Sequence, residues 1–292
     1  MSAKIIDGKI IAQQIKQELI EEIATLKSKG RTPGLATVLV GEDPASATYV
    51  RMKEKMCEEL GILTKSFKLP ASTTESELLS ITNQLKSDGE IHGILVQLPL
   101  PKHIDERNII NSIAENKDVD GLHPMSWGKM MKGEDTFLPC TPAGIQELLL
   151  RSGNNPEKKH VVIVGRSQIV GLPLANILVK KAIGANATVT VCHTGTKDIS
   201  QFTKQADILV AAIGKAEVIT ADMVSEKAVI IDVGVNRVEA PETKKGYRLV
   251  GDVHFESVSQ KVKAITPVPG GVGPMTIIML MKNTVKSTTQ TI

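Results

Sequence analysis

Tyr49 and Lys53 are the first residues of the chain whose types and spacing suggest chemistry. They lie four residues apart within 45–60, a stretch whose pattern predicts a helix, so the phenol and the amine share one helix face. A lysine amine has an ordinary pKa of about 10.4, and it acts as a base near neutral pH only where burial or positive neighbours lower that pKa. A surface Tyr–Lys pair without a function has the same spacing, so this pair alone does not indicate a site.

Two further polar positions favour a reaction site. Gln97 interrupts the apolar run 94–98, where an amide without a hydrogen bond costs about 1–3 kcal/mol. Asp120 lies in the segment 117–121 (KDVDG), directly before a turn. The amide and the carboxylate could converge on Lys53, although an aspartate at this position could equally cap the turn.

A glycine turn in the second half of the chain indicates a dinucleotide site. The apolar run 161–164 predicts a strand that leads into Gly165, Arg166 and Ser167. Gly165 permits a tight turn, and the start of the following helix offers N–H groups and its dipole to a pyrophosphate. Ser167 replaces the second glycine of the usual GxGxxG pattern, so the turn alone is a weak signal. Three further short apolar runs strengthen it, because they predict a doubly wound sheet: 188–192, 207–213 and 228–233.

The charges near this turn favour NADP over NAD. The run 188–192 ends before His193 and Thr194, where NAD-specific folds usually place a carboxylate for the ribose 2′-hydroxyl, and no carboxylate stands there. Arg166 and Lys197 would instead offer positive charge to a 2′-phosphate. Arg166 could also be a solvated turn residue, so binding of both cofactors must be compared.

The elements that carry these residues predict two α/β domains, the second a Rossmann-like doubly wound parallel sheet. The predicted elements of the first domain are helices at 9–28, 45–60 and 75–86 and strands at 35–40 and 93–98. A helix over 143–150 then leads to a polar turn at 152–156, where the domains meet. We expect the apolar helix at 275–285 to pack on the first domain and the polar residues 287–290 to fray.

The composition is that of an ordinary folded protein, with 292 residues, 41% of them hydrophobic and 23% charged. No apolar run reaches the roughly 18 residues that a membrane-spanning helix needs, and the N-terminal stretch lacks the layout of a secretory signal. We therefore expect a cytoplasmic protein without a membrane partner.

Several other function classes are disfavoured by composition and spacing. Cys57, Cys140 and Cys192 are too widely spaced for a CxxC metal site and are odd in number, so we expect buried free thiols. His123 and His193 stand singly, without metal-ligand spacing, so we expect no metal. The net charge is only +3, and no basic cluster is interleaved with aromatics, so a nucleic-acid partner is not expected.

Short-chain dehydrogenases also combine a YxxxK pair with a glycine-rich turn. In that family the cofactor turn opens the chain and YxxxK follows, whereas Tyr49 and Lys53 precede the glycine turn here and belong to a different predicted domain. The order of the motifs excludes that family.

Taken together, the motifs resemble those of the bifunctional methylenetetrahydrofolate dehydrogenase/cyclohydrolase family over nearly the whole chain. The segments that carry the resemblance are 49–53 (YVRMK), 93–101 (GILVQLPLP), 117–121 (KDVDG), 139–142 (PCTP), 164–171 (VGRSQIVG) and 267–276 (PVPGGVGPMT). Two departures are small: Thr194 stands where the family often has serine, and Val235 where isoleucine is usual.

The resemblance implies a folate-binding catalytic domain over 1–144, completed by the C-terminal helix 272–292, and an NADP-binding domain over 145–271, with a cleft between them. It implies oxidation of 5,10-methylenetetrahydrofolate to the methenyl cation with NADP, followed by hydrolysis to 10-formyltetrahydrofolate, and it suggests a homodimer.

The resemblance also implies roles for individual residues. Lys53, Tyr49, Gln97 and Asp120 would be catalytic. The folate would contact Tyr49, Asp120, Pro269, Gly270 and Gly271. NADP would contact Gly165, Arg166, Ser167, Thr194 and Val235.

Two alternatives stay open at this point. The same fold could support a dehydrogenase without cyclohydrolase activity if Lys53 or Gln97 were poorly placed. A non-catalytic NADP-binding sensor would need the nucleotide turn only, and the cluster of Tyr49, Lys53, Gln97 and Asp120 argues against it.

Overall fold

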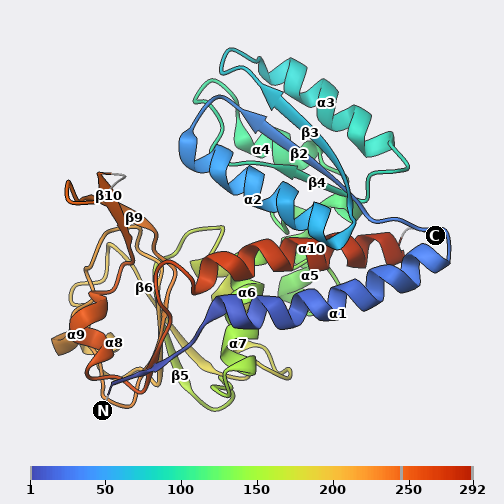
Figure 1. The fold of residues 1–292 in the computed structure, drawn as a ribbon. Coiled ribbons are helices and arrows are strands. Elements are labelled where there is room, and N and C mark those ends of the chain that lie inside the picture. The colour runs from blue at the N-terminus through green and yellow to red at the C-terminus, as the bar shows by residue number, and fades with distance from the viewer. Residues whose placement is uncertain (1, 244–245, 291–292) are drawn as a thin grey trace. The chain divides into compact units, whose positions relative to one another are not determined.

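The computed structural model describes residues 2–243 and 246–290 and divides into two compact units (Figure 1). One contains a six-stranded sheet and consists of the residues up to Gln13 together with Thr141–Thr276. The other contains a three-stranded sheet and consists of Gln14–Cys140 together with the residues from Ile277 onward. We call them the six-stranded unit and the three-stranded unit.

The three-stranded unit is built around one buried parallel strand. Strand β2 (Gly34–Val40) is buried at every position and pairs in parallel with β3 (Leu63–Leu69) on one side and β4 (Gly93–Val96) on the other. Apolar side chains from one face of β2 form a core with residues of α3 (Glu75–Ser87) and α4 (Glu106–Ser112). Strand β3 escaped sequence analysis because it lies at the sheet edge, is only partly buried and carries lysines.

Helix α2 (Pro44–Leu60) follows β2 and begins and ends at strong sequence signals. The Asp43 side chain accepts a hydrogen bond from the Ser46 amide at 2.7 Å, and proline occupies the first turn. Gly61 ends the helix in the left-handed conformation, at φ 66°. These caps determine where the helix that carries Tyr49 and Lys53 begins and ends.

The six-stranded unit confirms the predicted Rossmann-like parallel sheet. All strand pairs of its six-stranded sheet are parallel. The strand order is β1 (Lys4–Ile5), β11 (Ala264–Ile265), β8 (Val229–Asp232), β7 (Ile208–Ala211), β5 (His160–Val164) and β6 (Thr188–Cys192). The chain order reverses beside β5, and ligands bind doubly wound sheets at such a point, outside the carboxyl ends of the strands.

The first residues of the chain belong to a different unit from the one we expected. Strand β1 pairs in parallel with β11, which makes it the edge of the six-stranded sheet. The residues up to Gln13 therefore group with that sheet, although the sequence placed them in the first domain. Two-residue strands such as β1 and β11 carry too little periodicity to be recognised in sequence.

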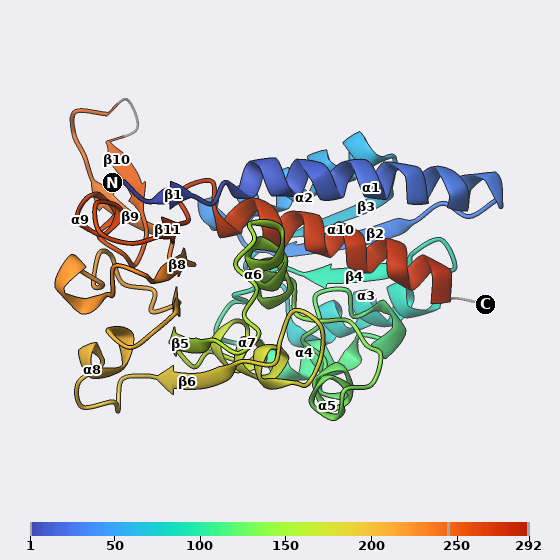
Figure 2. The same ribbon diagram turned by 90° about the horizontal axis from the view of Figure 1, so that it is seen from below.

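Helix α10 (Val272–Gln290) is longer than predicted, and its end does not fray within the described residues. Ser287 and Thr288 are buried, and the Ser287 hydroxyl donates to backbone oxygens of His92 and Asn116 at 2.6 and 2.7 Å. The polar residues we expected to fray thus hydrogen-bond within the three-stranded unit. Figures 1 and 2 show α10 running beside α1 (Gly8–Ser28).

The remaining elements are short. They are the helices α5 (Pro124–Lys132), α6 (Cys140–Arg151), α7 (Gly171–Val179), α8 (Ser200–Thr203) and α9 (Phe255–Ser259), the 3₁₀ turns η1 (Glu115–Lys117) and η2 (Ala221–Met223), and an antiparallel hairpin of β9 (Asn236–Glu239) and β10 (Tyr247–Val250).

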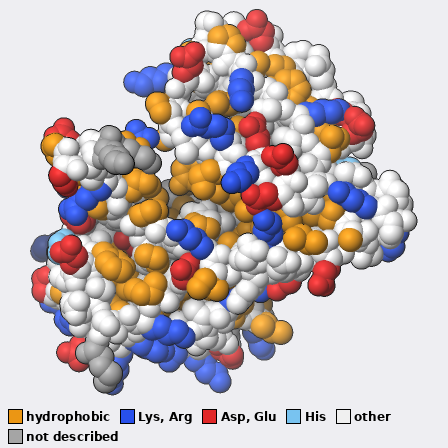
Figure 3. Space-filling view, viewed as in Figure 1, with side chains coloured by type: hydrophobic (Ala, Val, Ile, Leu, Met, Phe, Trp, Pro, Cys, Tyr) orange, Lys and Arg blue, Asp and Glu red, His pale blue; other side chains and the backbone are white. Residues whose placement is uncertain are grey.

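The surface mixes charged and apolar side chains. Over much of the face in Figure 3, acidic and basic groups are interspersed. Within 2–243 and 246–290, no helix combines the length and the apolar character needed to cross a membrane.

Candidate active site and nucleotide pocket

Lys53 and Gln97 meet in the three-stranded unit. The Lys53 side chain is buried, with the residue only 6% exposed, and its Nζ donates to Gln97 Oε1 at 2.9 Å. The Gln97 amide nitrogen donates to the Leu98 carbonyl at 2.8 Å, which turns the amide oxygen toward the amine. A buried amine is thus held by a neutral acceptor, which orients it without requiring it to carry a charge.

Tyr49 lies one helical turn before Lys53 on α2 and is half-buried. Burial raises the pKa of the Tyr49 phenol above its ordinary value, so the hydroxyl keeps its proton at neutral pH. The ring can flank a flat ligand while its hydroxyl remains a hydrogen-bond donor.

Asp118, rather than Asp120, caps the turn of the KDVDG segment. Its buried carboxylate accepts hydrogen bonds from the amides of Leu122 and His123 at 3.1 and 2.9 Å and from the Ser126 hydroxyl at 2.6 Å. The turn-capping role that the sequence left open for Asp120 therefore belongs to its neighbour. Asp120 stays half-buried, which suits a carboxylate that binds a ligand.

The buried charge of Asp118 makes stability depend on pH. Burial raises the pKa of Asp118 to about 6, against the opposing effect of its hydrogen bonds to Ser126, His123 and Leu122. In the unfolded chain the pKa of this carboxyl is about 3.9, so between about pH 4 and pH 6 the unfolded state loses this proton more readily than the folded state. The free energy of unfolding therefore falls by about 3 kcal/mol over this range.

The variant Asp118→Asn is expected to remove that part of the pH dependence of the unfolding free energy. Urea unfolding at several pH values across this range would measure the difference between the variant and the wild type. Asp135→Asn, at an exposed aspartate of the same unit, is the matched control. Parallel pH profiles for Asp118→Asn and the wild type would contradict the assignment.

Cys140 and Asn283 lie near the predicted site residues Lys53 and Asp120. The sequence did not point to either of them as part of the site. Burial, followed by the charge of Asp120, raises the pKa of the Cys140 thiol well above its ordinary value, while the charge of Lys53 acts in the opposite direction. Both groups are therefore close to the thiol. The Asn283 amide donates to the carbonyls of Val119 and Leu138 at 2.8 and 3.1 Å, which fixes the backbone next to Asp120.

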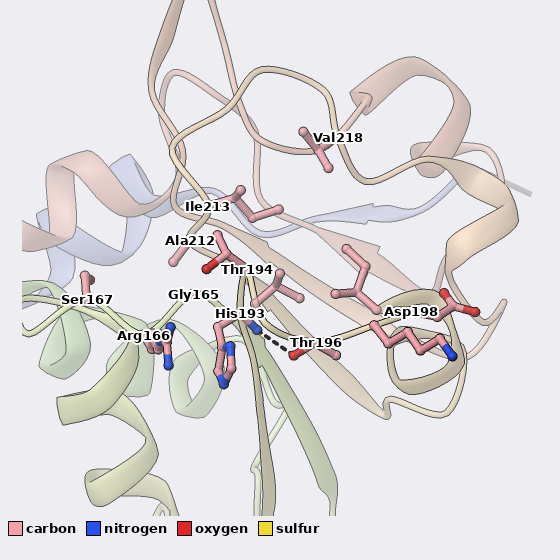
Figure 4. Close-up of a pocket in the computed structure, with 13 residues that line it drawn as sticks. Gly165, Arg166, Ser167, His193, Thr194, Thr196, Asp198, Ala212, Ile213 and Val218 are labelled. Carbon is pink, nitrogen blue, oxygen red and sulfur yellow. Dashed lines mark hydrogen bonds between the residues drawn. The ribbon is translucent and has the colours of Figure 1, made fainter.

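The six-stranded unit contains a pocket of about 560 Å³ at the carboxyl ends of its strands (Figure 4). Its walls include Gly165, Arg166, Ser167 and Thr194, four of the five residues predicted to bind the cofactor. Other lining residues are Val164, His193, Thr196, Lys197, Asp198, Ile199, Ala212, Ile213 and Val218. Among the described residues, Val235 does not line this pocket and is 48% exposed.

The shape of the turn after β5 fits a bound phosphate group. Gly165 has φ 133°, and a Cβ there would lie 2.1 Å from the Ala212 carbonyl oxygen, so only glycine fits. The Ser167 hydroxyl accepts from the amides of Val170 and Gly171 at 3.2 and 3.4 Å and so supports the start of α7. The turn offers the exposed backbone and helix start that suit a pyrophosphate.

Two side chains of opposite charge, Arg166 and Asp198, line the pocket near this turn. Arg166 is exposed at the pocket. In Figure 4 its side chain lies beside that of His193, the residue that follows the neighbouring strand β6. Asp198, which sequence analysis did not consider, also lines the pocket, and its carboxylate accepts from the Ser200 amide at 3.0 Å. A hydrogen bond with the Ser200 side chain, followed by the one from the Ser200 amide, lowers the pKa of Asp198.

The residues predicted to bind folate are divided between the units. Tyr49 and Asp120 belong to the three-stranded unit, whereas Pro269, Gly270 and Gly271 belong to the six-stranded unit. There the Gly270 carbonyl accepts from the Gly8 amide at 2.9 Å, and a Cβ at Gly8 would lie 1.8 Å from the Gly271 oxygen. In the part of the chain that the structure describes, no group of three His, Cys, Asp or Glu residues could hold a metal ion.

Comparison with known proteins gives consistent matches over nearly the whole chain. Residues 6–120 match the catalytic domain, and residues 139–292 the NAD(P)-binding domain, of tetrahydrofolate dehydrogenase/cyclohydrolase. A bifunctional protein FolD of Dehalococcoides mccartyi (strain CBDB1) is 58% identical, over 97% of this chain and 96% of its own.

Solved structures agree with these matches. The bifunctional FolD of Campylobacter jejuni is 48% identical and superposes with a TM-score of 0.93 over 100% of both chains. The Trypanosoma brucei FolD, solved with NADP cofactor and inhibitor, is 40% identical, with a TM-score of 0.94 over 99% of this chain and 98% of its own.

Proposed function

Because the chain belongs to the tetrahydrofolate dehydrogenase/cyclohydrolase family, we propose that it oxidises 5,10-methylenetetrahydrofolate to the methenyl cation with NADP and then hydrolyses the cation to 10-formyltetrahydrofolate. The observation that carries the proposal is the buried amine of Lys53, oriented by Gln97, in a chain that also has a glycine turn shaped for a dinucleotide. The three-stranded unit would bind the folate and the six-stranded unit the NADP.

The dehydrogenase step requires no acid–base catalysis. Hydride loss from the methylene carbon leaves a cation, with no proton for the protein to remove, and NADP supplies the acceptor when bound. The protein would accelerate this step by holding the methylene carbon and the nicotinamide close together in the right orientation. Gly165, Arg166, Ser167 and Thr194 would hold the dinucleotide, and Tyr49 would flank the folate.

The hydrolysis step requires proton transfer. Water attacks the methenyl carbon, and one proton must leave that water as its oxygen bonds to carbon. The Lys53 amine, in its neutral form, would accept that proton and could then return it to the ring nitrogen as the C–N bond breaks. The second proton, on the hydroxyl of the adduct, would be lost to solvent as the formyl C=O bond forms, so the reaction releases one proton overall. Gln97 suits this role because its neutral oxygen holds the amine in place in either protonation state.

Folate recognition would fall to a small set of polar and backbone groups. Asp120 would accept hydrogen bonds from the amino and ring N–H groups of the pterin. Pro269, Gly270 and Gly271 would line the folate through close backbone approach, and Val235 would contact NADP. On the family resemblance, the protein would act in the cytoplasm. It would form a homodimer through the six-stranded unit, and analytical ultracentrifugation would measure that oligomeric state.

An absorbance assay tests the proposed function directly. The purified protein is incubated with 5,10-methylenetetrahydrofolate and NADP, and authentic methenyltetrahydrofolate is then added. NADP reduction together with methenyl decay faster than in buffer is the expected result. Reduction alone would leave a dehydrogenase without cyclohydrolase activity, and neither signal despite NADP binding would favour a sensor.

The preference for NADP is expected to depend on Arg166. Replacing it with glutamine should raise the Kd for NADP about tenfold and leave the Kd for NAD nearly unchanged, since only NADP carries the 2′-phosphate. Isothermal titration with both cofactors would measure this. Lys227→Gln removes one exposed positive charge before the amino end of β8 and controls for net charge. Equal wild-type affinities for NAD and NADP would contradict the preference.

A further inference from the structure

A buried carboxylate fixes the loop that forms one wall of the nucleotide pocket. Asp252 is fully buried, and its two oxygens accept from three consecutive backbone amides after β7: Ile213 at 2.5 Å, Gly214 at 2.9 Å and Lys215 at 3.0 Å. A fourth donor, the Asn236 side-chain amide, reaches Asp252 Oδ1 at 2.9 Å. One side chain thus holds both the loop 213–215 and Asn236, the first residue of β9.

A second carboxylate holds Asp252 itself. Asp232, at the carboxyl end of β8, is buried and accepts from the amides of Asp252 and Val253 at 2.9 and 3.0 Å and of Gly234 at 3.1 Å. The packing leaves no space around the pair: a Cβ at Gly234 would lie 2.1 Å from Asp252 Oδ1, and one at Gly251 would lie 1.7 Å from Asp232 Oδ2.

The two carboxylates are buried close together at an electrostatic cost. Two carboxylates buried near one another repel, and burial together with the charge of Asp252 raises the pKa of Asp232 to about 7 despite three backbone donors. Apolar side chains of similar size would avoid that repulsion but would leave the amides that donate to Asp252 and Asp232 without acceptors, so the carboxylates serve to fix this backbone. All the donors to Asp252 lie beyond the carboxyl ends of β7 and β8, the edge at which such sheets bind ligands.

We propose that Asp252, anchored by Asp232, is a positioning residue for the dinucleotide reaction. By fixing the amides of Ile213 and Gly214, it sets the backbone of Ala212 and Ile213, which line the pocket beside Gly165. The contact between Gly165 and the Ala212 carbonyl couples this wall to the phosphate-binding turn. The inference rests on the proposed binding of NADP in this pocket.

The test is the variant Asp252→Asn, which is nearly isosteric but turns one acceptor into a donor facing backbone N–H groups. We expect the Kd and KM for NADP to rise at least about tenfold, equivalent to about 1.4 kcal/mol. Hydrolysis of methenyltetrahydrofolate, which consumes no cofactor and depends on Lys53 in the other unit, should stay within about twofold of the wild type. A merely structural role would instead lower both activities and the unfolding midpoint together.

Asp207→Asn is the matched control, because Asp207 accepts the His160 amide at 2.9 Å at the amino end of the same sheet. It should leave NADP affinity unchanged. Asn236→Ala removes one donor from Asp252 and should weaken NADP binding by a smaller factor, less than additively with Asp252→Asn. This second variant decides the matter if Asp252→Asn fails to fold.

Wild-type NADP affinity in Asp252→Asn, or in Asn236→Ala where the first variant is unfolded, would overturn the inference. So would a parallel loss of NADP binding and hydrolysis. Failure of the wild type itself to bind NADP would overturn the proposed function, and the inference with it.

Discussion

Replacing Lys53 with methionine is expected to slow hydrolysis of methenyltetrahydrofolate at least about a hundredfold, the usual range for loss of a general acid–base group. Dehydrogenation should fall by less than about tenfold, because hydride transfer from the methylene carbon needs alignment and no proton acceptor. Methionine keeps the length of the lysine stem and suits the buried site, so the fold should tolerate it.

Both rates can be followed in one cuvette, as NADPH formation and as decay of the methenyl absorbance. Lys55→Met is the matched control, since Lys55 lies on the same helix with its side chain 75% exposed and pairs only loosely with Glu59, at 3.8 Å. It should change neither rate. Equal losses of the two activities in Lys53→Met would show that the lysine serves binding or folding instead of proton transfer.

Replacing Asp120 with alanine is expected to raise the KM for folate substrates by about 10- to 100-fold, because hydrogen bonds to a charged acceptor contribute about 1.5–3 kcal/mol. The change should be similar for the dehydrogenase and hydrolase reactions, which would share one folate site. The Kd for NADP should stay unchanged, because the nucleotide turn belongs to the other unit.

Initial-rate kinetics at varied folate, together with NADP titration, would measure these changes. Asp135→Ala serves as the control, because Asp135 is an exposed aspartate of the same unit whose side chain pairs with Lys286. An unchanged folate KM in Asp120→Ala would remove Asp120 from the folate site. Loss of NADP binding as well would indicate a wider structural effect.

The sequence predicts most of the elements that hold the site because their signals are local. The caps of α2, the apolar run of β2 and the glycine turn after β5 all lie within a few residues of the structure they specify. The pairing of Lys53 with Gln97 could also be anticipated, since a polar residue directly after a buried strand needs a partner.

Other features depend on contacts between distant parts of the chain and leave no local pattern. Asp118 and Asp120 are two residues apart and indistinguishable by type, yet only the folded turn shows which of them caps it. Asn283 reaches Val119 across 164 residues, and Asp252 reaches Ile213 across 39. In the sequence, each of these residues is one ordinary polar position in an otherwise apolar or turn segment.

The division of each unit between two chain segments bears on the order of synthesis. The three-stranded unit needs α10, which leaves the ribosome only after the whole six-stranded unit has been made. Until then the carbonyls of Val119 and Leu138 lack the Asn283 amide, and the backbone beside Asp120 is incompletely fixed. Most of the three-stranded unit is translated before residues 141–276, yet the backbone beside Asp120 receives the Asn283 hydrogen bonds only after that whole stretch has been made.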